Sequence, residues 1–139
     1  METTENPRLQ MIEAALTRHP EAVVQTTIRL WEQLAPELIL IIGQGGFTPL
    51  FARSVRQVCK QHACLAQYVA KPLDKERFTE LRNCLQAQDP AQASQTSLDL
   101  FAIFLDLLDS LIGEELTTHL LHSAWSKETF ETPAKDFFK

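Results

Sequence analysis

The residues with the clearest chemical potential are Glu115, His119 and His122, close to the C-terminal end of the chain. Their spacing is i, i+4, i+7, so on a helix all three side chains share one face. A carboxylate and two imidazoles are ligands that a transition metal accepts. A metal site also needs further ligands from elsewhere, and a solvated helix face has the same pattern. A metal ion at these residues is therefore one hypothesis, and no other cofactor is suggested.

The same histidines carry a resemblance to a known family. The segment 119–124 is similar to the phosphoacceptor motif of histidine phosphotransfer domains in its first histidine and its final small residues. His122 and Ser123 stand where that family has lysine and glycine, and the resemblance covers these six residues alone. It implies a helical bundle that carries a phosphoryl group on an exposed histidine. Phosphotransfer at His119 or His122 is accordingly an alternative function.

A cluster of glycines, Gly43, Gly45 and Gly46, follows a short apolar run and resembles a fragment of a nucleotide-binding loop. Thr48 occupies the place of the third glycine of a dinucleotide fingerprint, and no Lys-Ser/Thr pair follows. No other segment supplies a β-branched run for a parallel sheet. We predict instead a buried helix over 36–43, with glycines that let two helices approach closely and turn.

The other reactive side chains do not form a recognised constellation. Cys59, His62 and Cys64, with Cys84 further along, match no standard zinc spacing, and small buried thiols explain them. The chain has no nucleophile elbow and no H-E-x-x-H motif. The sequence therefore gives no support for catalysis and favours a protein that acts by binding.

Composition narrows the classes further. With 139 residues, 45% of them hydrophobic and 22% charged, the chain is expected to fold as one domain over 1–125 with a docked or frayed tail over 126–139. The net charge of -5 and the scattered basic residues argue against nucleic acid and anionic membranes as partners. The acidic N-terminus resembles no secretory signal, and no apolar run is long enough for a membrane span, so a cytoplasmic location is expected.

Hydrophobic periodicity and Pro caps predict helices throughout. The expected fold class is all-α, a compact bundle of five to six helices around a buried central helix at about 97–112. Asp99, Asp106 and Asp109 form the one polar stripe of that helix. The other expected helices cover about 7–18, 20–35, 36–43, 48–61, 72–88 and 114–125.

The amount of apolar helix suggests a function in binding. The central helix is apolar almost all round, so we predict that it is enclosed by neighbours or by a partner subunit. The leading hypothesis is a self-associating protein-interaction domain in a bacterial-type cytoplasmic regulatory setting, and the alternative is a small-molecule or metal sensor with a site between helices. Candidate interface or ligand-lining residues are the three clustered glycines with Phe101, Phe104 and Leu108.

A short internal echo accompanies these patterns. Ile42-Gly43-Gln44 is followed by Phe47-Thr48, and Ile112-Gly113-Glu114 is followed by Leu116-Thr117 with one residue skipped. Duplication of a helical hairpin and chance both explain a match this short.

Overall fold

The computed structural model describes residues 7–60 and 78–125, and this part of the chain holds five α-helices and no strand. The predicted all-α bundle is confirmed. A single turn of 3-10 helix, Pro20–Ala22, follows the first helix. The tail predicted over 126–139 and the start of the helix predicted over 72–88 lie outside the described residues. The α-helices are α1 (Pro7–Arg18), α2 (Val23–Val58), α3 (Thr79–Gln86), α4 (Pro90–Ile112) and α5 (Glu114–Trp125).

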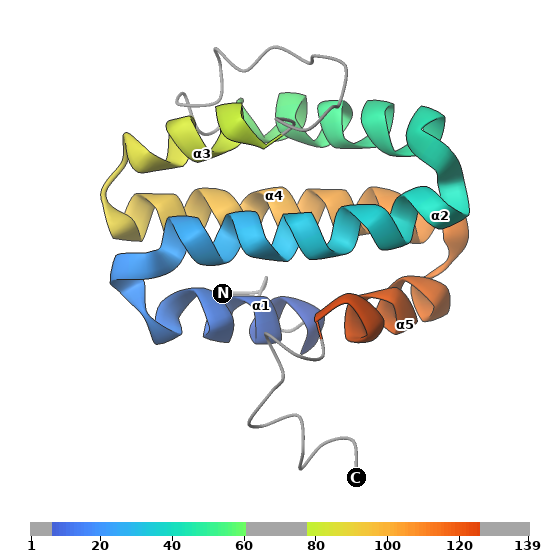
Figure 1. Cartoon of the computed structure of the whole chain (residues 1–139), viewed down its shortest axis with the longest axis horizontal. Helices are drawn as coiled ribbons and strands as arrows, with labels where there is room; N and C mark the ends of the chain where they lie inside the picture. Colours follow the sequence, from blue (N-terminus) through green and yellow to red (C-terminus); the bar gives the residue numbers. More distant parts are fainter. Residues whose placement is uncertain (1–6, 61–77, 126–139) are drawn as a thin grey trace, which may run out of the picture.

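Two long helical segments form the middle of the bundle (Figure 1). The first arm of α2, residues 23–42, lies beside α4, and the two run in the same direction. At Gly43 the chain bends back into the second arm of α2, residues 44–58, which lies with α3 on one side of this pair. α1 and α5 lie on the opposite side. Both returns, at Gly43 and between α4 and α5, are therefore at the same end of the molecule.

The course of α2 corrects two sequence predictions. Separate helices were expected over 20–35 and 36–43, and another was expected to begin at 48, but Pro36 and Pro49 both lie inside α2, whose one residue with non-helical angles is Gly43. A proline inside a helix loses one backbone hydrogen bond and costs about 3 kcal/mol. Leu34, Leu38 and other buried side chains of α2 supply packing that offsets this cost. Tertiary burial thus overrides the local signal at both prolines.

α4 matches its prediction as the central helix. The Asp89 carboxylate caps the helix by accepting a hydrogen bond of 2.8 Å from the backbone N–H of Gln92, and Gly113 follows the last residue of the helix. Asp106 is exposed and Asp99 and Asp109 are half-buried, whereas the apolar positions of the helix lie mostly in the core. The aspartate stripe therefore reaches water in part, but it is not the single exposed edge of α4, because Leu111 on another side of the helix is 58% exposed.

The described residues also show an approximate two-fold repeat. The first arm of α2 corresponds to α4, and its second arm corresponds to α5, with matching positions 70 residues apart and no residue skipped. Gly43 (φ 76°, ψ 166°) and its counterpart Gly113 (φ 97°, ψ 148°) share the same unusual backbone conformation. Both members are buried in the pairs Thr27 and Ser97, Trp31 and Phe101, Leu34 and Phe104, Leu38 and Leu108, Phe51 and Leu121, and Val55 and Trp125.

Two contacts place the axis of this repeat. The Thr27 hydroxyl donates a hydrogen bond of 2.8 Å to its own counterpart, the Ser97 hydroxyl. One turn further on, the rings of Trp31 and Phe101 stack, with centroids 4.4 Å apart and planes 6° apart. A residue touches its own counterpart only beside a symmetry axis, so the axis runs between α4 and the first arm of α2. The match of Ile42-Gly43-Gln44 to Ile112-Gly113-Glu114 is thus part of a repeat that extends through the core, whereas the match of Phe47-Thr48 to Leu116-Thr117, which needs a skipped residue, is not.

Candidate interaction surface

The exposed apolar side chains of the described residues gather near the two bends. The large hydrophobic residues with high exposed fractions are Leu40 (84%), Ile41 (48%), Leu111 (58%) and Leu116 (38%). Each lies within three residues of Gly43 or Gly113 in the sequence, and both bends are at one end of the bundle (Figure 1). We call these four residues the bend-end surface. Exposed apolar residues that lie close together are typical of binding surfaces.

Helix geometry explains why these side chains face water. Leu38 packs in the core, and Leu40 follows it by about 200° around the helix, which directs it away from the core. The prediction of a buried helix over 36–43 is therefore wrong for Leu40 and Ile41, because only one side of this short segment has a neighbour. The 3.6-residue spacing of the core-facing residues in this helix was the sequence signal that could have identified Leu40 and Ile41 as exposed.

The length and apolar composition of α2 also resemble those of a membrane-spanning helix. α2 is long and apolar enough to cross a membrane by length and composition, and 28% of its most apolar 18-residue window is buried. The core helix of a soluble protein passes the same test. The backbone turn at Gly43 divides α2 into two arms that pack in one bundle. The absence of a membrane partner stays a prediction.

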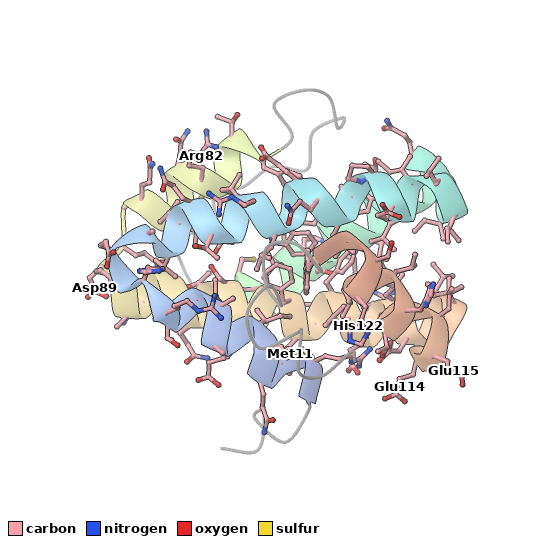
Figure 2. All side chains as sticks on the ribbon, turned by 60° about the horizontal axis from the view of Figure 1, so that its bottom comes forward. Met11, Arg82, Asp89, Glu114, Glu115 and His122 are labelled. Atoms are coloured by element: carbon pink, nitrogen blue, oxygen red, sulfur yellow. The ribbon has the colours of Figure 1, made fainter. Side chains whose placement is uncertain are left out.

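Charge differs between the two halves of this end. Glu114 and Glu115 open α5 and are exposed, and Figure 2 shows both at the end of the bundle. Their counterparts after the other bend are Gln44 and Gly45, which are exposed and neutral. Acidic residues in a first helical turn interact favourably with the helix dipole. One half of the bend end is thus acidic, and the other is uncharged.

An ion pair fastens α1 beside the acidic half. The Arg8 guanidinium donates two hydrogen bonds to the Asp109 carboxylate, of 3.0 and 2.8 Å. This hydrogen bonding raises the pKa of Arg8, with smaller contributions from the charges of Glu114 and Asp106, against the opposing effect of burial. A bidentate arginine–carboxylate pair fixes orientation as well as position. The pair therefore holds the start of α1 against the end of α4.

The predicted metal-binding residues sit on α5. Glu115 and His119 are exposed and His122 is half-buried. Across the described residues, no group of three His, Cys, Asp or Glu side chains lies close enough to hold a metal ion. The hypotheses of a metal site and of phosphotransfer at His119 or His122 stay predictions.

Acid should destabilise the fold through His122. Burial lowers its pKa, and the nearby His119 charge lowers it further. The unfolded chain, with a histidine pKa of about 6.5, then binds the proton more readily than the folded chain. The stability contributed by neutral His122 is therefore fully present above the unfolded-state pKa. It is lost as the pH falls toward the lower pKa of His122 in the folded state. Urea unfolding between pH 7.5 and 5.5 measures this loss, which His122→Gln should reduce more than His119→Gln. An unchanged pH dependence in His122→Gln would contradict it.

The other predicted site residues lie elsewhere. Phe101, Phe104 and Leu108 are fully buried within the chain, so they form core and offer no surface to a partner. The central helix was predicted to be enclosed by neighbours or by a partner subunit, and the other helices of the same chain enclose it. Of the clustered glycines, Gly43 makes the turn, whereas a Cβ at Gly45 would meet nothing within 4 Å and one at Gly46 would meet its own neighbour Ile42. Close helix approach at Gly45 and Gly46 is therefore not observed.

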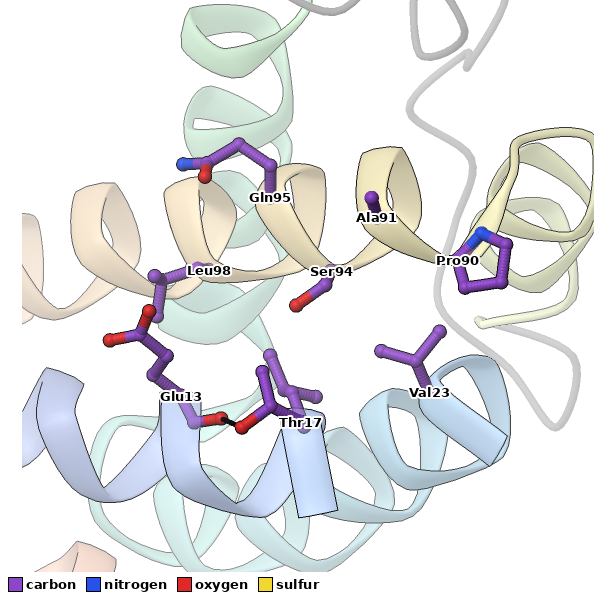
Figure 3. A pocket seen from close by; sticks show the side chains of 9 residues that line it. Glu13, Thr17, Val23, Pro90, Ala91, Ser94, Gln95 and Leu98 are labelled. Carbon is purple, nitrogen blue, oxygen red and sulfur yellow. Dashed lines mark hydrogen bonds between the residues drawn. The ribbon is translucent and has the colours of Figure 1, made fainter. Parts of the chain in front are cut away.

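A shallow groove lies between α1 and the start of α4, with a volume of about 420 Å³. Leu16, Val23 and Leu98 line it with apolar surface, and Glu13 and Ser94 are among its polar residues (Figure 3). None of the predicted ligand-lining residues belongs to it. The sensor hypothesis thus stays a prediction.

Comparisons of the chain with protein-family models, with curated proteins and with solved structures gave no match.

Proposed function

We propose that this protein is a helical interaction domain that acts by binding and that self-associates through the bend-end surface. The observation that carries the proposal is the gathering of Leu40, Ile41, Leu111 and Leu116 at one end of a bundle whose other apolar side chains are largely in the core. Covering this surface removes apolar area from water, which favours association.

The rest of the molecule supports a role in binding. The core is continuous and filled by the chain's own aromatic and aliphatic side chains, so the central helix needs no partner to cover it. The bend-end surface, by contrast, has one acidic half and one neutral half around its apolar residues. An apolar centre with a polar surround is the usual composition of a protein–protein interface.

Leu40→Glu should weaken self-association at least about 10-fold, because it places a charge where apolar surface must lose its water. The fold should be little affected, since the Leu40 side chain is 84% exposed. Sedimentation equilibrium across a range of concentrations measures the dissociation constant, and urea unfolding checks the fold.

Ala91→Glu is the matched control, because Ala91 is exposed in the first turn of α4, at the opposite end of the bundle. It adds the same charge and should leave the dissociation constant unchanged. A wild-type chain that stays monomeric up to millimolar concentration would refute self-association. Equal effects of the two substitutions would place the contact elsewhere.

A further inference from the structure

The axis of the internal repeat leaves the bundle at the bend end. α4 and the first arm of α2 run in the same direction on either side of the axis, and both finish at a glycine with positive φ. The bend-end surface consequently has two halves, the α2 bend and the α4–α5 bend, whose backbones correspond, although Leu40 and Leu116 match Ser110 and Gly46. Ile41 and Leu111 are counterparts, 70 residues apart, with exposed fractions of 48% and 58%.

A surface of this kind can meet a second copy of the chain in two symmetric ways. A two-fold contact brings the same patch of both copies together. In the first arrangement each half lies against the same half of the other copy. In the second, which we call the crossed arrangement, the α2 bend of each copy lies against the α4–α5 bend of the other.

We infer that two copies of this chain dock end to end in the crossed arrangement, an inference that rests on the proposed self-association. Charge decides between the two. The first arrangement places Glu114 and Glu115 of one copy against the same residues of the other, and like charges opposed across an interface are unfavourable. The crossed arrangement places them against Gln44 and Gly45, which carry no charge.

The shapes of the two halves also favour the crossed arrangement. Leu116 is 38% exposed, and its counterpart is Gly46, which has no side chain. The neighbouring Gly45 is exposed, and the space where its Cβ would lie is open. In the crossed arrangement the Leu116 side chain of each copy projects toward this bare stretch of the other copy's α2. In the first arrangement the two leucines meet each other, and the two glycine stretches leave a gap.

Cross-linking of single-cysteine variants of the full chain distinguishes the arrangements. Cys59, Cys64 and Cys84 are first replaced by serine, and sedimentation confirms that the dimer persists. Ile41→Cys and Leu111→Cys are then made in separate chains, one of which carries a tag that shifts its mass. Each variant alone, and the mixture of both, is treated with a short bifunctional maleimide.

The crossed arrangement is expected to give a strong cross-link between positions 41 and 111 in the mixture and little product with either variant alone. Cross-links of each variant to itself, with none in the mixture, would overturn the crossed arrangement and leave self-association standing. A stable dimer with no cross-link in any sample would also overturn it. A chain that does not dimerise would refute the proposed function itself, which separates the two failures.

Removal of the acidic charges gives a second readout. Glu114→Gln combined with Glu115→Gln should change the dissociation constant less than about 2-fold in the crossed arrangement, because exposed charges facing neutral groups contribute little. If the acidic halves face each other, the same change relieves repulsion. The dimer would then tighten by about 5-fold or more and lose its dependence on salt concentration, which would contradict the inference.

Discussion

Replacing Phe101 by alanine should lower the free energy of unfolding by about 3–5 kcal/mol, the cost of removing a large buried aromatic side chain. Phe101 is fully buried and stacks on Trp31 at 4.4 Å, while Trp125 meets it edge-on at 5.6 Å. Its loss removes contacts from both sides of the repeat. Urea unfolding of the full chain, followed by tryptophan fluorescence and by far-UV circular dichroism, measures the change.

Exchange of the two stacked rings tests whether the core is symmetric as well as large. Trp31→Phe alone leaves a void and Phe101→Trp alone adds volume, and each should be destabilising. The double variant restores the total ring volume beside the axis. It should be more stable than the sum of the single changes predicts by at least about 1 kcal/mol. Additive effects would mean that the two positions are not interchangeable.

One polar atom makes this exchange informative. The Trp31 indole N–H is buried and has no hydrogen-bond acceptor among the described residues, whereas the Trp125 indole N–H donates to the Leu30 carbonyl at 2.8 Å. A buried donor without a partner is costly. Trp31→Phe removes that cost along with some packing, so it should be less destabilising than Trp125→Phe.

The all-α class and the position of α4 were readable from the sequence, because both depend on the periodicity of apolar residues. The continuation of α2 through Pro36 and Pro49 was not readable. The packing that overrides a proline comes from α3, α4 and α5, which are distant in the sequence. Local signals and tertiary burial conflict there, and burial prevails.

The site was harder to predict than the fold. Phe101 and Leu40 are both apolar residues in apolar helices, yet one is at the centre of the core and the other is 84% exposed. The sequence shows which residues are apolar, but only the arrangement of the helices shows which of them lack a neighbour. The internal echo in the sequence held more information than was used, because extending it without a gap pairs Trp31 with Phe101 and Ile41 with Leu111.

Gly43→Ala and Gly113→Ala should each lower the free energy of unfolding by about 1–3 kcal/mol, because a side chain strongly disfavours these backbone angles. Space is not the obstacle, since a Cβ at either position would meet nothing within 4 Å. Gly45→Ala is the matched control, because Gly45 is helical with equally open surroundings and lies two residues from Gly43. It should raise stability by about 0.5–1 kcal/mol. Urea unfolding in the Leu40→Glu background keeps self-association out of the measurement. If Gly43→Ala and Gly45→Ala changed the free energy of unfolding in the same direction, the bend at Gly43 would be absent in solution. The helix ends that carry Ile41 and Leu111 would then not be held side by side.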